Sequence, residues 1–115
     1  MTYDDNNIFA KILRGEILCK KIYEDDYVLS FHDINPQKKI HALVIPKGKY
    51  IDLDDFSEKA SSEEIVGLLK GINIAAKKLG ISVDTGKGYR ALTNISENGG
   101  QEVPHLHFHL FGGEI

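Results

Sequence analysis

The sequence predicts an α+β domain with a mainly antiparallel sheet. Short runs rich in β-branched and aromatic residues fill residues 19–46, a long stretch with helical periodicity covers residues 61–80, and two more strand-like runs follow. Strands grouped on either side of one long helix are typical of this class and not of an alternating parallel sheet. No repeat or linker-like stretch divides the chain, so residues 1–115 are predicted to form a single domain.

The first expected elements are a short helix and a hairpin. Asn7 can cap a helix that begins at Ile8, and Gly15 is well placed to end it. The runs CKKIYE (residues 19–24) and YVLSFHD (residues 27–33) flank two aspartates, which predicts two antiparallel strands joined by a tight turn.

The middle of the chain predicts a third strand and the long helix. IHALVIP (residues 40–46) is rich in β-branched residues and ends at a proline. Ser61 and Glu64 have the spacing of a capping box, and Gly80 supplies the stop. Between them the apolar residues recur at helical period: Ile65, Leu68, Leu69, Ile72, Ala75, Ala76 and Leu79.

The last two strands are expected in GYRALTN (residues 88–94) and HLHFHLF (residues 105–111). A glycine-containing loop, residues 95–102, separates them. The predicted sheet therefore has five strands, accompanied by one long and one short helix.

Composition excludes several classes of function. The formal net charge of -3 argues against a general nucleic-acid-binding surface, which needs a clustered basic face. No run approaches the roughly 20 apolar residues of a membrane span. Cys19 is the single cysteine, so no intrachain disulfide forms, and the acidic N-terminus is unlike a signal peptide. We expect a cytoplasmic protein that binds neither nucleic acid nor membrane.

Three of the five histidines alternate with apolar residues near the C-terminus. On a strand, residues two apart share a face, so His105, His107 and His109 would lie on one side. The intervening Leu106, Phe108 and Leu110 would then pack on the long helix. Burial alone does not call for three imidazoles in register, because each brings two ring nitrogens that need partners.

Three interpretations of these histidines compete. They could be a polar sheet face without function, or a three-histidine zinc site completed by a ligand such as Asp33, Glu102 or His41. In the third, one imidazole is a nucleophile and the others bind an anion and manage protons. The preceding NGGQE loop favours the third, because glycines such as Gly100 let backbone amides approach an anion closely.

The motif HLHFHLF resembles the signature of the histidine-triad (HIT) superfamily, in which three histidines alternate with apolar residues. The resemblance to its Hint branch extends over nearly the whole chain and includes, in order, NIFAKILRGEI, YEDDYVLSFHDINPQ, HALVIPK, GYRALTN and GGQEVPHLHFHLFGG. It implies a five-stranded antiparallel sheet that pairs with a second copy into a ten-stranded homodimer. It also implies hydrolysis of nucleoside 5′-phosphoramidates, or related purine nucleotide derivatives, through a covalent nucleotidyl-histidine, with no metal and no cofactor.

The resemblance assigns the catalytic roles. It implies that His107 is the nucleophile, that His109 binds the phosphate region and steadies the leaving group, and that His105 supports the site. His41 matches the family's fourth histidine and would polarise or orient the nucleophilic ring. Glu102 stands where several Hint relatives have a serine that serves the leaving group, and it could donate a proton there.

The resemblance also implies a nucleotide-binding set. Asp33 would take the ribose hydroxyls, and Asn94, Gly100 and Gln101 would lie near the phosphate. The base would lie among apolar residues, namely Ile8, Phe9, Ile17, Phe31 and Ile34. Each residue has a simpler interpretation as core, helix anchor or turn residue, since apolar side chains in small domains are usually core and aspartate often begins a turn.

Two other functions stay open at this point. One is a nucleotide-binding regulatory or scaffold protein whose hydrolysis is incidental. The other is a metal-dependent hydrolase. No structural zinc is expected near the N-terminus, because NNIFAK stands where some bacterial relatives have cysteines.

Overall fold

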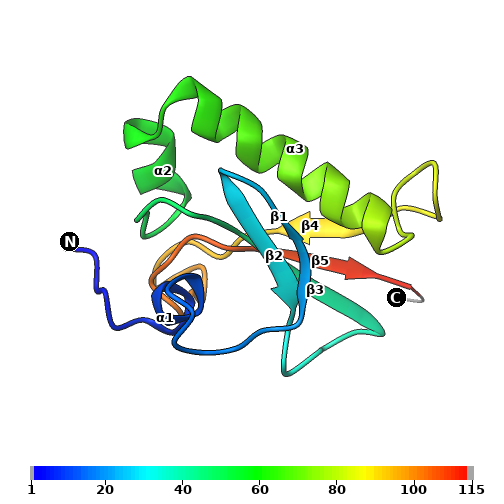
Figure 1. Ribbon diagram of the computed structural model, residues 1–115, viewed down its shortest axis with the longest axis horizontal. Coiled ribbons are helices and arrows are strands. Elements are labelled where there is room, and N and C mark those ends of the chain that lie inside the picture. Colours follow the sequence, from blue (N-terminus) through cyan, green and yellow to red (C-terminus); the bar gives the residue numbers. More distant parts are fainter. Residues whose placement is uncertain (1, 114–115) are drawn as a thin grey trace.

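The computed structural model describes residues 2–113 and contains three helices and five strands. Figure 1 shows their arrangement. In chain order they are α1 (Ile8–Leu13), β1 (Lys21–Glu24), β2 (Val28–His32), β3 (Ile40–Pro46), α2 (Leu53–Lys59), α3 (Ser62–Lys78), β4 (Arg90–Leu92) and β5 (Phe108–Gly112).

The five strands form one sheet in the order β1-β2-β3-β5-β4, with every neighbouring pair antiparallel. The predicted hairpin is present, and the Asp25 side chain accepts hydrogen bonds from the backbone N–H groups of Tyr27 and Val28 at its turn. β3 and β5 lie side by side at the centre, with Leu43 opposite His109 and His41 opposite Phe111. This register brings residues about 70 positions apart in sequence onto one surface, and it confirms the predicted α+β class.

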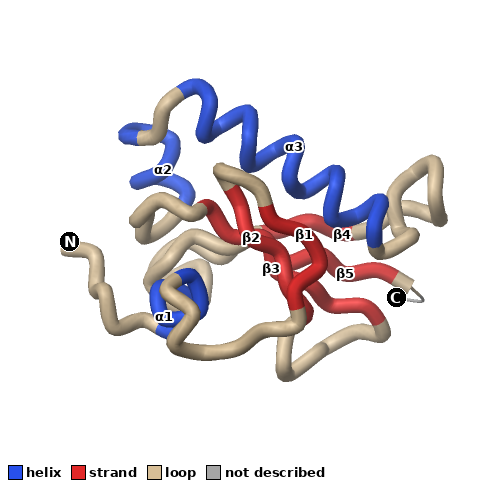
Figure 2. Tube along the Cα trace, in the orientation of Figure 1, coloured by secondary structure: helices blue, strands red, loops and turns tan. Residues whose placement is uncertain are grey.

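Both faces of the sheet are covered, by different helices (Figure 2). On one face, α3 packs on alternate strand residues, including Val28, Val44 and Leu110. On the other face, α1 contributes Phe9 to a second cluster with Leu29, Phe31, Leu43 and Ile45. Consecutive residues of β2 and β3 therefore point into different cores, which explains why these strands are apolar at almost every position.

The long helix has the predicted ends. The Ser61 side chain accepts from the Glu64 backbone N–H at 3.1 Å, and the Glu64 carboxylate accepts from the Ser61 backbone N–H at 3.0 Å. Gly80 follows the helix with φ +73°, a left-handed conformation that glycine adopts without strain. Gly71 permits close packing on the sheet, since a Cβ atom there would lie 2.6 Å from Cγ2 of Val28.

Two features differ from the sequence prediction. α2 was not predicted, and it begins after Asp52, whose side chain accepts from the Asp55 backbone N–H. The last strand begins only at Phe108, so the prediction that residues 105–111 form one strand is wrong for its first part. The Leu106 N–H donates to the carbonyl oxygen of Tyr50 in the loop before α2, and not to a neighbouring strand.

The burial pattern expected for the histidine segment still holds. Leu106 and Leu110 are fully buried in the core beneath α3, and Phe108 packs against the same core. His107 and His109 line the opposite side, although only His109 belongs to β5. The side chains thus already point to alternate sides of the sheet at residues 106 and 107, before the hydrogen-bonded strand begins at Phe108.

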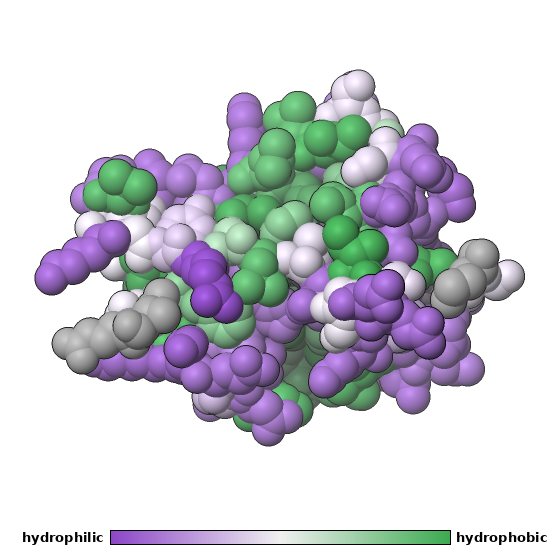
Figure 3. Space-filling view, turned by 180° about the vertical axis from the view of Figure 1, so that it is seen from behind, coloured by the Kyte–Doolittle hydropathy of each residue, from purple (hydrophilic) through white to green (hydrophobic). Residues whose placement is uncertain are grey.

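The surface is not uniformly polar. Seen from behind, hydrophobic residues gather across the middle of the molecule, with hydrophilic residues around them (Figure 3). The exposed large apolar residues include Val66 and Leu69 of α3, at 49% and 62% exposure. Among residues 2–113, no helix has the length and apolar character needed to cross a membrane.

Candidate active site

A cavity of about 570 Å³ opens on the α1 face of the sheet. One part of its wall is apolar and includes Ile8, Ile17 and Phe31, and another part carries His107 and His109. Two carboxylates, Asp33 and Glu102, also line it, and Arg90 is the only lysine or arginine among the lining residues. The cavity therefore joins an apolar recess to a polar, imidazole-bearing wall, as small-molecule sites commonly do.

His107 has a defined tautomer. Its Nδ1 lies 2.8 Å from the carbonyl oxygen of His105, and because a carbonyl can only accept, Nδ1 must carry the proton. In the neutral ring the lone pair is then on Nε2. The ring edge packs against Phe9, with centroids 4.9 Å apart, and this contact restricts its rotation. His107 thus presents an unprotonated nitrogen from a fixed ring.

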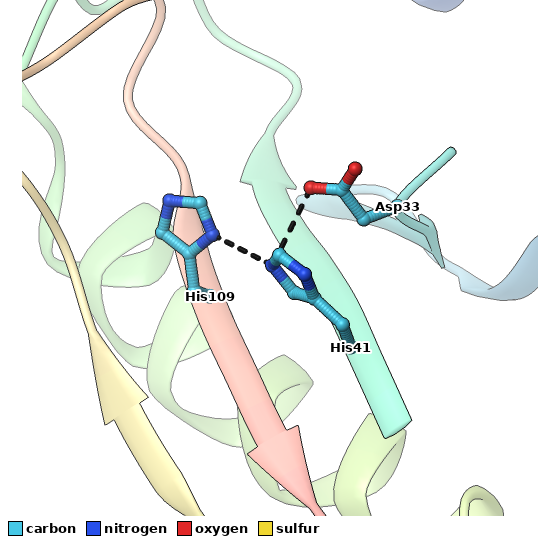
Figure 4. Close-up of side chains that lie close together, drawn as sticks. All are labelled: Asp33, His41 and His109. Carbon is cyan, nitrogen blue, oxygen red and sulfur yellow. Dashed lines mark hydrogen bonds and ion pairs between the residues drawn. The ribbon is translucent and has the colours of Figure 1, made fainter. Parts of the chain in front are cut away.

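His109 and His41 form a hydrogen-bonded pair beside Asp33 (Figure 4). Nε2 of His41 lies 2.9 Å from Nδ1 of His109 and 3.4 Å from Oδ2 of Asp33. The backbone N–H of Gln37 donates to Nδ1 of His41 at 3.1 Å, so that nitrogen is the acceptor and Nε2 carries the proton. His41 then donates to Nδ1 of His109, which leaves the proton of His109 on its own Nε2.

The expected role of His41 needs correction. The sequence prediction had His41 polarising or orienting the nucleophilic ring, but its Nε2 contacts His109, and it is the His105 carbonyl that holds His107. The reason is the strand register: His41 is opposite Phe111 and two pairs away from His109, on the same face, while His107 lies before β5 begins.

The same three residues have the chemistry of a metal site. The ligand atoms of Asp33, His41 and His109 lie within 4.8 Å of one another, a spacing that a divalent ion could span. Coordination through Nε2 of His41 would move its proton to Nδ1, where it would face the Gln37 N–H donor. A metal would therefore break an existing hydrogen bond. The two histidines and Asp33 fit a hydrogen-bonded group better than a set of metal ligands.

Burial lowers the pKa of all four histidines of the site. Loss of solvent is the largest cause in each case, and it brings the pKa of His105 and of His109 to about 4. For His107 the hydrogen bond to the His105 carbonyl and then the Asp33 charge oppose this effect only in part, and for His41 the Asp33 charge does so; the pKa of each stays below its usual value. The imidazoles are therefore mostly neutral near pH 7, where they act as hydrogen-bond donors and acceptors.

Most of the predicted site residues meet at this cavity. Its wall includes Ile8, Phe9, Ile17, Phe31, Asp33, Ile34, Asn94, Gly100, Glu102, His107 and His109. Three predicted residues lie outside the lining: His41 and His105, which are buried behind it, and Gln101.

Gln101 holds the glycine loop instead of facing the cavity. Its Nε2 donates to the carbonyl oxygens of Ile51 and Val103, and its Oε1 accepts from the Ser96 N–H. Asn94 acts similarly with its Nδ2, which donates to the Gly99 carbonyl oxygen, although Asn94 also lines the cavity. Both side chains therefore shape the loop that carries Gly100.

Sequence reasoning missed Arg90 and Phe111. Arg90 lies opposite Phe111 across the β4–β5 pair, and its guanidinium carbon is 5.3 Å from the centre of that ring. The Phe111 ring in turn lies parallel to His109, with centroids 5.7 Å apart. Their positions depend on the register between two strands, and no local pattern in the sequence signals it.

Comparisons with known proteins identify the family. The sequence model of the HIT domain family matches residues 14–114 of this chain. The chain belongs to the HIT family. It is 54% identical to an uncharacterized 13.2 kDa HIT-like protein of Azospirillum brasilense, over 97% of this chain and 89% of the relative. It is 45% identical to an uncharacterized HIT-like protein of Helicobacter pylori, over 94% of this chain and 97% of the relative.

Solved structures of HIT proteins have the same fold. A HIT family hydrolase from Clostridium thermocellum superposes with a TM-score of 0.86 at 37% identity, covering 96% of this chain and 93% of that one. A histidine triad protein from Clostridium difficile has a TM-score of 0.85 at 39% identity, covering 99% of this chain and 96% of that one. The expected HIT fold is confirmed.

Proposed function

We propose that this HIT protein is a hydrolase of the Hint type that cleaves purine nucleoside 5′-phosphoramidates or related nucleoside 5′-phosphate derivatives. The observation that carries the proposal is the tautomer of His107: the His105 carbonyl accepts from Nδ1, so Nε2 offers its lone pair from the wall of the cavity. The lowered pKa keeps this nitrogen unprotonated near neutral pH, and a neutral imidazole attacks without prior deprotonation.

The reaction has two displacements at the α-phosphorus. In the first, Nε2 of His107 forms a bond to phosphorus while the bond to the leaving amine breaks, and the amine takes a proton from His109, from Glu102 or from water. In the second, water attacks phosphorus, the bond to His107 breaks, and the nucleoside monophosphate leaves. Because His41 donates to Nδ1 of His109, the single proton of the neutral His109 ring lies on Nε2, where it can donate a hydrogen bond to the leaving group; transfer of a proton from this ring requires its protonated form.

The rest of the cavity supports nucleotide binding. Phe9, Ile17 and Phe31 offer an apolar recess that can cover both faces of a base. The Asp33 carboxylate accepts from the Asn35 N–H through Oδ1 and has acceptor capacity left for ribose hydroxyls. Alignment of the nucleotide by these contacts would contribute much of the rate enhancement.

Mass spectrometry after rapid quenching tests the proposal. With an adenosine or guanosine 5′-phosphoramidate, we expect a mass increase of one nucleotidyl group on the peptide that contains His107. Activity should also persist in excess chelator, since no step needs a metal. An adduct on another residue, or tight binding of mononucleotide with no adduct, would contradict the proposal, and the second result would favour a regulatory nucleotide-binding protein.

We also propose a homodimer that acts in the cytoplasm. β4 is at the edge of the sheet, and Val66 and Leu69 leave apolar surface on α3 that a second copy could bury. Sedimentation equilibrium should give twice the chain mass, and Leu69→Glu should weaken the association. The single cysteine agrees with a reducing compartment.

A further inference from the structure

Tyr3 contacts the buried side of the histidine motif from outside the matched HIT domain, which begins at residue 14. Its hydroxyl oxygen lies 2.6 Å from Nδ1 of His105, and the two rings meet edge to face with centroids 5.6 Å apart. Tyr3 does not line the cavity, so a bound nucleotide would not touch it.

The direction of this hydrogen bond follows from the other side of the His105 ring. Nε2 of His105 lies 2.9 Å from the carbonyl oxygen of Pro46, which can only accept, so Nε2 carries the proton. Nδ1 is then the acceptor, and the Tyr3 hydroxyl donates to it. His105 is completely buried, and an imidazole nitrogen without a partner there would be costly.

His105 is also the residue that fixes the nucleophile. Its backbone N–H donates to the Val103 carbonyl oxygen at 2.9 Å, and its own carbonyl accepts from Nδ1 of His107 at 2.8 Å. His105 is therefore held by four hydrogen bonds. Its ring bonds to the Tyr3 hydroxyl and the Pro46 carbonyl, and its backbone bonds to the Val103 carbonyl and to Nδ1 of His107. A displacement of its ring would be transmitted to the carbonyl that sets the tautomer of His107.

We propose that Tyr3 is a positioning residue that acts through His105 to hold His107 for attack. This inference rests on the proposed function for its kinetic consequence, and on the hydrogen bonds alone for its structural part. The N-terminal segment is also attached by an ion pair between Asp5 and Lys49, at 2.8 Å, but both partners are largely exposed and such pairs contribute little. The Tyr3 hydroxyl is thus the principal polar link between this segment and the site.

Tyr3→Phe removes the hydroxyl and keeps the ring. We expect kcat for a phosphoramidate to fall about tenfold, the effect of losing one buried hydrogen bond, while KM and the product Kd stay within twofold. The matched control is Tyr23→Phe, which removes a hydroxyl that donates to Asp25 at 2.8 Å on the β1–β2 hairpin. The control should leave kcat unchanged, and thermal melting should show both variants folded.

Nitrogen-15 NMR of the histidine rings provides a measurement that needs no turnover. In the wild type we expect the proton of His105 on Nε2 and that of His107 on Nδ1. Tyr3→Phe should shift the His107 Nδ1–H signal and speed its exchange with solvent, and Tyr23→Phe should do neither. Unchanged His107 signals together with unchanged kcat would overturn the inference. A shifted His107 signal in a protein that forms no nucleotidyl adduct would support the positioning link and reject the proposed reaction.

Discussion

The two faces of the sheet use the same strands for different purposes. Beneath α3 the strands present a closed apolar core, in which Leu106 and Leu110 have no exposed surface. On the α1 face, residues adjacent in sequence to these leucines present imidazoles to a cavity. A single segment, residues 105–111, contributes to both by alternation, so the rigidity of the core is transferred directly to the site.

The difference lies in how each face satisfies its buried groups. The α3 face needs only shape complementarity, as the contact between Gly71 and Val28 illustrates. The other face must give every buried ring nitrogen a partner, and it does so with carbonyls, a tyrosine hydroxyl and a second imidazole. Within the part of the chain that is described, no buried side-chain nitrogen or oxygen lacks a hydrogen bond. Function on this face therefore depends on polar connections that tolerate little change.

The largest expected effect is the loss of the nucleophile. His107→Ala should lower kcat at least about a thousandfold, because the nitrogen that accepts the nucleotidyl group is lost, while nucleotide binding by the apolar recess persists. Steady-state hydrolysis and calorimetric binding of the mononucleotide measure the two quantities. Retained hydrolysis in a folded variant would refute the assignment of His107.

The adjacent residue should show the opposite behaviour. Leu106→Ala removes a fully buried side chain beneath α3 and should lower the free energy of unfolding by about 3 kcal/mol, from lost burial and the remaining cavity. Because the site is on the other face, kcat per folded molecule should change much less than in His107→Ala. Urea denaturation and active-site titration separate the two effects. A stability change below about 1 kcal/mol would show that the α3 face repacks more freely than its burial suggests.

Local sequence signals predicted the α3 face more completely than the site. The capping box at Ser61 and Glu64, the stop at Gly80 and the alternation of Leu106 and Leu110 all act over a few residues, so periodicity reveals them. α2 was not predicted because it is only seven residues long and Phe56 is its only buried residue. A single buried position produces no periodic pattern.

The site depends on contacts between distant segments. The triad itself is a local motif and identified the family, but the partner of His41 is decided by the register of β3 against β5. Arg90 reaches the cavity through the pairing of β4 with β5, and Tyr3 reaches His105 across 102 residues. Residue type and spacing along the chain do not reveal which distant segments come into contact. A resemblance to a family supplies the first set of residues, and the folded structure supplies the contacts between them.

Acid should destabilise the site face through its buried imidazoles. His105 has a folded-state pKa of about 4, against about 6.5 for the unfolded chain, so the unfolded state binds more protons between these values. The free energy of unfolding should therefore fall as the pH drops from 7 to 4, by up to about 3 kcal/mol from this group. Urea denaturation across that range measures the slope. His105→Gln has no titrating group at this position, so its free energy of unfolding should depend less steeply on pH. A slope equal to that of the wild type would assign the effect to other residues.

The smallest expected effect concerns the N-terminal caps of α1 and α3, the helices on the two faces of the sheet. Asn7 caps α1, its Oδ1 accepting from the Ala10 N–H at 2.9 Å, and Ser61 caps α3. Replacing either residue with alanine should cost about 1 kcal/mol of stability, measured by urea denaturation. Only Asn7→Ala should also raise KM, since α1 carries Phe9 and Phe9 packs against His107. An equal rise in KM for Ser61→Ala would mean that the two faces are coupled through the sheet and do not act independently.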